Sequence, residues 1–385
     1  MSEHDAYRAA GVDYDALDAG KRLAMAKALS TSALLAARGG RALDDSRGEP
    51  AFVFELGSQT LAFVVEGLGT KSMIARQVLE GQGIDRFADV AYDTVAAIVN
   101  DLSCVGALPL VVNAYFATGA SEWYGELERA GALLEGWRSA CADAGCVWGG
   151  GESPSLPGLL SEADIELAGA AVGAVPAGRA AILGERLAAG DEIVLVASSG
   201  LHANGASLAR LIAGRLPDGY ATELPMYGSV PSTVGAGAAA TTFGEALLEP
   251  SVMYVPLIAA LLQDADVELS YLSHITGHGL LKLMRPPKEL TYRVERLPAV
   301  PPVLSFLVEH AGMDAPAAYS TFNMGAGFAL YCRAGGGGRI VASAERLGLH
   351  ALLAGRVEQG PRQVVLEPVG VRFAGDRLEL SVGQA

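Results

Sequence analysis

The segment LAFVVEGLGTKS, from Leu61 to Ser72, decides the fold of this chain. Its five leading apolar residues predict a buried strand, and the two glycines that follow allow the backbone to approach a ligand closely. A carboxylate at the strand end, Glu66, and an ammonium group, Lys71, suit the phosphates of a magnesium nucleotide. The spacing does not match G-x-x-x-x-G-K-[ST], so an ordinary glycine turn with a surface lysine is the alternative interpretation.

The sequence on either side of this segment predicts alternating strands and helices. Residues 51–55 read as a second strand, residues 41–50 as a polar loop, and residues 15–37 as a helix that Gly39 and Gly40 end. Apolar residues at helical spacing predict helices over 89–102 and 122–144, and residues 165–175 read as a strand. The pattern indicates an α/β fold.

A Pro/Gly-bearing segment beginning at Pro176 divides the chain. At 385 residues the chain exceeds the ~250–300 residues at which single cores stop growing, so we expect two domains, 1–176 and 177–385. The second half predicts strands at 191–197, 291–296 and 327–332, and helices at 206–213, 246–262 and 342–347. The glycine run 335–338 reads as a loop or hairpin.

Composition restricts the partners and the location. With 28 Lys and Arg against 43 Asp and Glu, the net charge of −15 argues against nucleic acid and anionic membranes as partners. No apolar run reaches the ~18 residues of a membrane span, and the charged residues between Met1 and Ala10 do not resemble a signal peptide, which predicts a cytosolic protein. The four cysteines form no CxxC pair, so we expect buried free thiols.

The predicted helix 89–102 carries three polar residues on an otherwise apolar pattern. Asp93 and Asn100 are seven residues apart and therefore lie on nearly the same line of the helix, with Asp101 beside them. Their oxygen atoms are ligands that Mg²⁺ prefers. A capping or solvent-facing polar stripe is the alternative interpretation.

Four small-residue segments could contact a ligand; a tight loop explains 149–158 nearly as well, and 273–279 and 319–327 could equally be turns around a core. The segment 149–158 places Glu152 after three glycines, and 198–205 lies between a strand and a helix N-terminus, which favours an anion site. His202 in that segment could donate a proton, although a lone histidine is more often structural. The segments 273–279 and 319–327 are similar in composition, and Gly277 argues against a zinc helix containing His274 and His278.

Taken in order, these segments resemble the phosphoribosylformylglycinamidine cyclo-ligase family, also called the aminoimidazole ribonucleotide synthetases. The sequence EGLGTK at 66–71 is similar to the family's D-G-V-G-T-K, and VNDL at 99–102 matches its V-N-D-L. GGESPSLPG at 150–158 is similar to G-G-E-T-A-E-M-P-G, and 198–208 to S-S-G-x-H-S-N-G-x-S-L. The resemblance extends from about Ala10 to about Gly370, nearly the whole chain.

The resemblance implies an N-terminal domain whose sheet pairs across a homodimer, a larger C-terminal α/β domain, and a cleft near the dimer seam. It also implies an ATP- and Mg²⁺-dependent reaction in which formylglycinamidine ribonucleotide becomes aminoimidazole ribonucleotide, after phosphorylation of the amide oxygen. By resemblance the catalytic residues are Lys71, His202 and Asp101, and the metal ligands are Glu66, Asp93 and Asp101. The implied ATP contacts are Glu66, Gly67, Gly69, Thr70, Lys71, Asp93, Asn100 and Glu152, and the implied substrate contacts are Ser198, Ser199, Gly200, His202, Asn204 and Asn323.

The chain departs from the family's pattern at several places. A glycine-rich G-G-F-G-A-L lid, present in most members near the position of 41–50, is absent here. The family's aspartate is Glu66, the second carboxylate of its G-G-E-T-A-E is Ser155, and a glycine of its H-L-T-G-G-G is His278. Two other readings stay open: a kinase of the same superfamily that acts on another substrate, and a nucleotide-binding paralogue without catalysis.

Overall fold

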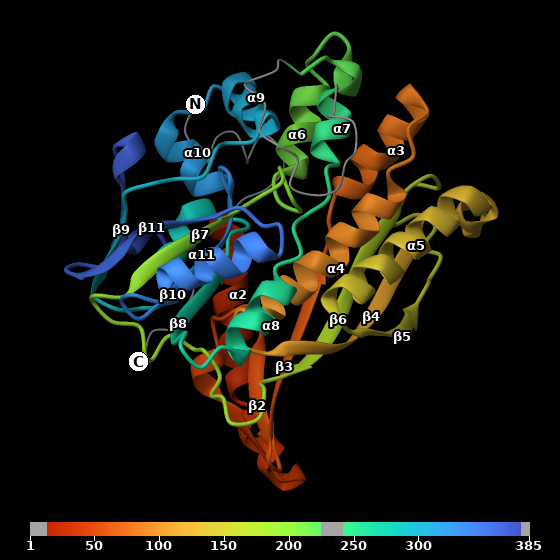
Figure 1. Ribbon diagram of the computed structural model, residues 1–385. Helices are drawn as coiled ribbons and strands as arrows, with labels where there is room; N and C mark the ends of the chain where they lie inside the picture. The colour runs from red at the N-terminus through yellow and green to blue at the C-terminus, as the bar shows by residue number, and fades with distance from the viewer. Residues whose placement is uncertain (1–13, 225–241, 379–385) are drawn as a thin grey trace.

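The computed structural model describes residues 14–224 and 242–378, and in this part of the chain two β-sheets each carry helices, as the sequence predicts (Figure 1). The first sheet has six strands in the order β1-β2-β3-β6-β4-β5. Only β4 and β5 are parallel; the other pairs are antiparallel. The strands are β1 (Gly40–Leu43), β2 (Phe52–Leu56), β3 (Gln59–Gly67), β4 (Leu108–Thr118), β5 (Val147–Glu152) and β6 (Ile165–Ala174).

Three helices cover one face of this sheet: α3 (Lys71–Gln82), α4 (Phe87–Ser103) and α5 (Leu127–Ala144) (Figure 1). Side chains alternate along β3, so Ala62 and Val64 are buried under the helices. Phe63 and Val65 point to the opposite face and remain 41% and 61% exposed. The helix-covered face is therefore a core, while the other face is an apolar surface that no described residue covers fully.

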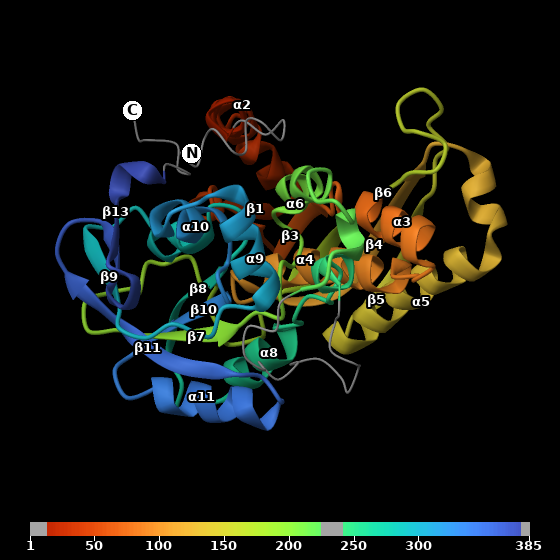
Figure 2. The same cartoon turned by 90° about the horizontal axis from the view of Figure 1, so that it is seen from above.

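The second sheet has seven strands in the order β13-β12-β9-β11-β7-β10-β8. Helices α8 (Val255–Gln263) and α11 (Gly337–Arg346) lie on one side, and α9 (Pro302–Ala311) and α10 (Ala315–Thr321) on the other (Figure 2). Helices α6 (Ala206–Ala213) and α7 (Phe243–Leu247) both contact α3 and α9, and so connect the two halves. The strands are β7 (Glu192–Ala197), β8 (Leu269–His274), β9 (Leu290–Val294), β10 (Ala326–Cys332), β11 (Ala351–Gln359), β12 (Gln363–Leu366) and β13 (Val371–Ala374).

Some predicted elements differ from those observed. The helix predicted over 15–37 is α2 (Tyr14–Leu29) followed by a separate 3-10 helix, and the loop predicted over 41–50 contains β1, which pairs with β2. The ligand loop predicted over 149–158 begins with β5, because Val147 to Glu152 pair with β4. The glycine run 335–338, predicted as a loop or hairpin, is a loop only in its first half, because Gly337 and Gly338 already belong to α11. The predicted helix 206–213 is confirmed by α6.

The expected domain boundary after residue 176 lies in the connection between Ala174, the end of β6, and Glu192, the start of β7. The division into two domains stays a prediction. Residues 1–10, to which the prediction of no signal peptide refers, lie outside the described residues. Among the described residues no helix combines the length and apolarity needed to cross a membrane. All four cysteines are free, and three of them are buried.

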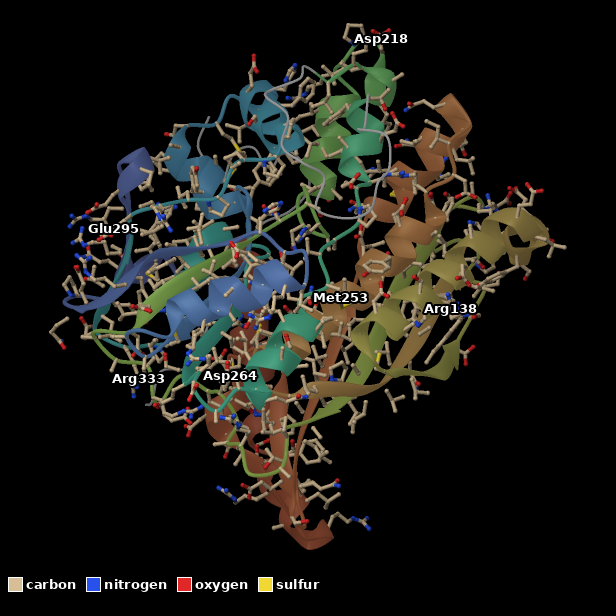
Figure 3. The ribbon with its side chains drawn as sticks, in the orientation of Figure 1. Arg138, Asp218, Met253, Asp264, Glu295 and Arg333 are labelled. Carbon is tan, nitrogen blue, oxygen red and sulfur yellow. The ribbon has the colours of Figure 1, made fainter. Side chains whose placement is uncertain are left out.

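Helix α4 is fastened to the second half by Asn100. Its amide Nδ2 donates to the carbonyl oxygen of Val252 at 2.9 Å, and its Oδ1 accepts from the backbone N–H of Tyr254 at 2.9 Å. The intervening residue, Met253, lies at the seam where α4 approaches α8 (Figure 3). Because both ends of the buried amide are used by backbone groups, Asn100 is a structural link in this conformation.

We expect Asn100→Ala to lower the free energy of unfolding by about 2–5 kcal/mol, because two buried backbone groups lose their partner. Thermal and urea unfolding monitored by circular dichroism would measure the loss. The matched control is Arg138→Ala, on the outer side of α5, whose exposed pair with Glu135 should leave the midpoint unchanged (Figure 3). Equal midpoints for both variants would contradict the role given to Asn100.

Candidate active site

The turn between β3 and α3 forms one wall of the site. Gly69 adopts a left-handed conformation with φ +70°, which explains why a glycine is needed there. Glu166 of β6 accepts a hydrogen bond from the Gly69 backbone, while burial raises the pKa of its carboxyl group. The Thr70 hydroxyl lies 3.2 Å from that of Ser207, at the start of α6, so the turn meets the second half directly. Nothing in the sequence around Glu166 indicated this contact.

Lys71 lies fully buried at the seam between the two halves. Its ammonium group forms an ion pair with Asp93 of α4 and donates to the backbone carbonyl of His202 at 2.8 Å. The other carboxylate oxygen of Asp93 accepts from the backbone N–H of Ser251 at 2.6 Å. Both Asp93 oxygens therefore have protein partners, and in this conformation Lys71 contacts protein rather than solvent.

His202 is held in a left-handed conformation with φ 60°. Its Nε2 accepts a hydrogen bond from the Ser199 backbone N–H, so the proton of the neutral ring sits on Nδ1. Burial, and then the charges of His274 and Lys71, lower the pKa of His202 well below its ordinary value. Among the described residues Nδ1 has no hydrogen-bond partner. The structure thus holds a neutral imidazole whose N–H group is available to donate a hydrogen bond to a ligand.

The segment 198–205 is fixed by Asn323. The Asn323 side chain accepts from the Ser198 hydroxyl at 2.8 Å and donates to the Gly200 carbonyl at 2.9 Å. The Ser199 hydroxyl donates to the carbonyl of Pro250 at 2.5 Å, and Asn204 is only partly buried. Ser198, Ser199 and Asn323 therefore shape this segment through their side chains, while its backbone remains the part that could contact a ligand.

A second cluster of charges lies at the carboxyl end of β8. Asp101 Oδ1 lies 2.6 Å from His274 Nδ1, and both side chains are buried. Burial raises the pKa of Asp101, but the hydrogen bond and charge of His274 outweigh it and lower that pKa overall. Lys282 donates to the Thr276 hydroxyl and to the His274 carbonyl. The sequence prediction included Asp101 but missed Lys282, because nothing local distinguishes Lys282 from a surface lysine.

The predicted magnesium ligands do not form a ready-made metal site. No group of three His, Cys, Asp or Glu side chains within the described residues is arranged to bind a metal ion. Carboxylate oxygen is nevertheless the right donor for Mg²⁺, and Asp101 uses only Oδ1 for His274. Glu66 and Asp101 therefore fit Mg²⁺ by their chemistry, whereas Asp93 would first have to leave Lys71. The assignment of Asp93 stays a prediction.

Glu152 lies away from this cluster. The strand register aligns Glu152 with Tyr115, Tyr115 with Ala168, and Ala168 with Gly67. Three strand spacings of ~4.8 Å put the backbone of Glu152 about 14 Å from that of Gly67. Its carboxylate is exposed and accepts from the Ser153 N–H at 3.1 Å. The predicted nucleotide contact of Glu152 stays a prediction.

The described residues outside glycine contain three positions with positive φ: His202, His278 and Met324. Each lies in a different one of the segments that the sequence suggested could approach a ligand. Such conformations cost about 1–3 kcal/mol each and persist where the surroundings enforce them, often at functional sites. Their gathering in these three segments supports a ligand site there.

The polar segment 41–50 is anchored to the second half. Tyr271 donates its hydroxyl proton to Glu49 at 2.8 Å, Arg285 Nε lies 3.7 Å from the same carboxylate, and Arg285 donates to the Gly48 carbonyl at 2.8 Å. The segment 41–50, which lacks the family's glycine-rich lid sequence, therefore packs against the second sheet. Sequence patterns could not reveal this contact, whose partners are 222 residues apart.

Comparison with known proteins identifies the family. The model of the AIR synthase related protein N-terminal domain matches residues 48–175, and that of the C-terminal domain matches residues 188–367. The chain belongs to the AIR synthase family. The chain is 34% identical to a phosphoribosylformylglycinamidine cyclo-ligase of Carboxydothermus hydrogenoformans, over 94% of this chain and 98% of that protein. It is 36% identical to the enzyme of the same name from Sorangium cellulosum, over 91% and 94% of the two chains.

Solved structures of this AIR synthase-like fold are more distant in sequence. Hydrogenase maturation protein HypE in complex with ATP is 16% identical, with a TM-score of 0.55 over 81% of this chain and 83% of that one. ThiL complexed with AMPPCP and TMP is 17% identical, with a TM-score of 0.53 over 85% and 90%. These structures establish the fold that this AIR synthase family member shares with them.

We expect Lys71→Met to lower the free energy of unfolding by about 3–5 kcal/mol, because the buried Asp93 carboxylate loses its counter-charge. The double variant Lys71→Met/Asp93→Asn should recover most of that loss, since no unpaired charge remains. Urea unfolding of both variants measures this difference. A double variant as unstable as the single one would show that the ion pair is not what stabilises this seam.

Proposed function

We propose that this chain catalyses the ATP-dependent cyclisation of formylglycinamidine ribonucleotide to aminoimidazole ribonucleotide in purine biosynthesis, as a cytosolic enzyme. The observation that carries the proposal is a relative of that cyclo-ligase name at 34% identity over 98% of its length. The polar side chains at the seam support it, because Glu66 comes from β3, Asp101 from α4, His202 from the loop after β7 and Lys282 from the 3-10 helix η5 (Gly279–Met284).

In the proposed reaction the amide oxygen of the substrate takes the γ-phosphoryl group of ATP, and ADP leaves. The substrate's own nitrogen then attacks the amide carbon, the C–O bond breaks, and phosphate and a proton are released. Most of the catalytic effect comes from positioning and charge neutralisation. Mg²⁺, when bound through Glu66 and Asp101, would neutralise phosphate oxygens.

The chain's own residues have distinct tasks in this proposal. The neutral His202 offers its Nδ1–H to the amide oxygen or to the phosphate that forms on it, a donor with no other partner among the described residues. The backbone at Gly67, Gly69 and Thr70 surrounds the nucleotide phosphates, and Ser198 to Asn204 hold the substrate. Lys71 fixes the seam through Asp93 and contacts phosphate after it leaves that carboxylate.

The test is ADP release coupled to formation of aminoimidazole ribonucleotide, with purified protein, ATP, Mg²⁺ and formylglycinamidine ribonucleotide. We expect turnover by the unmodified chain and a loss of at least about 100-fold in kcat for Asp101→Asn, because a charge that holds the metal is removed. Leu127→Gln, an exposed position on α5, serves as the control with unchanged kcat.

Two outcomes would replace the proposal. ADP release that depends on a different acceptor would favour a kinase of the same superfamily, a reading supported by the fold of ThiL complexed with AMPPCP and TMP. Nucleotide binding without any ADP release would favour a paralogue that has lost catalysis. Full turnover by Asp101→Asn would show that Asp101 is not needed for catalysis, and the proposed cyclisation would still stand.

We also propose that the chain works as a homodimer joined through the open face of the first sheet. Exposed apolar side chains gather on its strands, and monomers rarely leave such a surface uncovered. Within the described residues β5 is an edge strand of the sheet, so its outer side is a second place that a partner could approach. The members of this surface are Phe63, Val65, Val111, Tyr115 and Val147.

Light scattering after size exclusion should give a mass near twice 39.6 kDa for the unmodified chain at micromolar concentration. Val65→Glu should convert it to the monomer, because a carboxylate on a buried apolar interface pays a desolvation penalty. The control Leu127→Glu changes a residue that is 79% exposed outside this face and should remain dimeric. A dimer that survives Val65→Glu would exclude this face as the interface.

A further inference from the structure

The end of α5 brings two of the four cysteines together. Gly145 adopts a left-handed conformation with φ 68°, its backbone N–H donates to the Ala142 carbonyl, and the N–H of Cys146 donates to the Cys141 carbonyl at 2.9 Å. These two bonds define a Schellman motif, in which the residues at the positions of Cys141 and Cys146 commonly place their side chains in contact. Cys141 belongs to the hydrophobic core, and Cys146 packs against the same core.

The distance between these two cysteines suits a disulfide bond. The 2.9 Å hydrogen bond from the N–H of Cys146 to the Cys141 carbonyl, with the covalent bonds on either side of it, limits the separation of the two Cα atoms to about 6.8 Å. Disulfides join cysteines whose Cα atoms lie ~4.4–6.8 Å apart. The pair can therefore close while the end of the helix keeps its conformation.

The two thiols differ in exposure and in acidity. Cys146 is partly exposed, whereas Cys141 is 3% exposed. The hydrogen bond with Cys141 lowers the pKa of the Cys146 thiol, and the hydrogen bond with Cys146 raises the pKa of Cys141. A thiolate that solvent can reach is the form of cysteine that an oxidant attacks first. Cys146 is therefore the first thiol to react, and Cys141 is its resolving partner.

We propose that Cys141 and Cys146 form a reversible disulfide when hydrogen peroxide oxidises them, which makes the end of α5 a thiol-oxidation site. The sulfur of Cys146 attacks the peroxide, the O–O bond breaks, and a sulfenic acid and one water molecule form. The sulfur of Cys141 then attacks the sulfenic sulfur, the S–O bond breaks, and the hydroxyl group leaves as water with the proton of Cys141. Two thiols are oxidised, one peroxide molecule is reduced to two water molecules, and an added dithiol reverses the change.

The oxidation site lies where α5 meets β5, and the proposed reaction does not use it. Cys146 directly precedes Val147, the first residue of β5, so the disulfide would tie the start of that strand to the helix. The other two cysteines provide a comparison, because Cys104 at the end of α4 and Cys332 in β10 are both buried. Burial raises the pKa of Cys332 to about 12, which keeps its thiol protonated and slow to react.

The experiment treats the folded full chain with hydrogen peroxide, removes the peroxide with catalase, and alkylates the remaining thiols with iodoacetamide after unfolding. Trypsin cleaves after Arg138 and Arg179 and gives one peptide, residues 139–179, that contains both cysteines of the pair and no other cysteine. By mass spectrometry we expect this peptide to lose two hydrogen atoms and to take up no alkyl group. The pair should lose its thiols at least about tenfold faster than Cys104 or Cys332. Dithiothreitol added before alkylation should restore both thiols.

Three variants test the order of the two steps. Cys141→Ala removes the resolving thiol, so Cys146 should stop at the sulfenic acid, which dimedone labels. Cys146→Ala removes the attacking thiol, so Cys141 should remain open to alkylation. Cys332→Ala is the matched control and should form the disulfide at the rate of the unmodified chain. If a variant does not fold, judged by circular dichroism, the peptide mass of the unmodified chain decides.

The proposal is overturned if peptide 139–179 keeps both thiols under conditions that fully oxidise free glutathione, or if it gains oxygen atoms instead of losing hydrogen atoms. A disulfide to a second copy of the chain, seen on a non-reducing gel, would also overturn the internal pair. Thiol oxidation is measured without nucleotide or substrate. A chain that forms this disulfide but no aminoimidazole ribonucleotide would retain this inference and lose the proposed reaction, and the reverse result would do the opposite.

Discussion

The structure depends on a buried ammonium group. Lys71 lies where the first sheet's helices meet the segment after β7, and its charge is satisfied by Asp93 and by the carbonyl of His202. An ionic group enclosed in this way is tolerated only with close partners, so the two halves must keep this alignment. The same contact holds the backbone of His202, whose Nδ1–H has no hydrogen-bond partner within the part of the chain that the structure describes.

Polar links of the same kind extend the seam on both sides of Lys71. Asn100 binds the backbone around Met253, and Arg285 and Tyr271 bind Glu49 in the segment 41–50. Buried polar groups stabilise only when their partners are correctly placed, and therefore these links specify one arrangement of the two halves. The candidate site is formed by that arrangement, since neither sheet alone contributes all of its charged groups.

The site balances its own charges before any ligand binds. Asp93 is paired with Lys71, Asp101 with His274, and Lys282 donates to the His274 carbonyl. A site of this kind avoids the cost of isolated buried carboxylates while retaining groups that can respond to an incoming polyanion. The chain's net charge of −15 opposes a phosphate ligand at long range, so local cations and backbone N–H groups have to provide the attraction.

The sequence by itself determined strand β3 with its glycine turn and helices α4 and α6, because these follow from local periodicity. It also determined the family, because the motifs occur in the family's order. It also selected the segments in which His202, His278 and Met324 adopt strained conformations. The sequence predicted neither β4 nor β8 as a strand. For β8 the reason is that a short strand buried along its whole length lacks a distinctive period.

Only the tertiary structure decided which groups meet. Lys71 and His202 are 131 residues apart, and Asp101 and His274 are 173 residues apart, so no local pattern could pair them. Lys282 meets the Asp101–His274 pair, through the His274 carbonyl, only because η5 packs against β8. Side-chain chemistry is written in the sequence, whereas the distance between two charges, and hence their energy, is fixed by the packing of elements that are far apart along the chain.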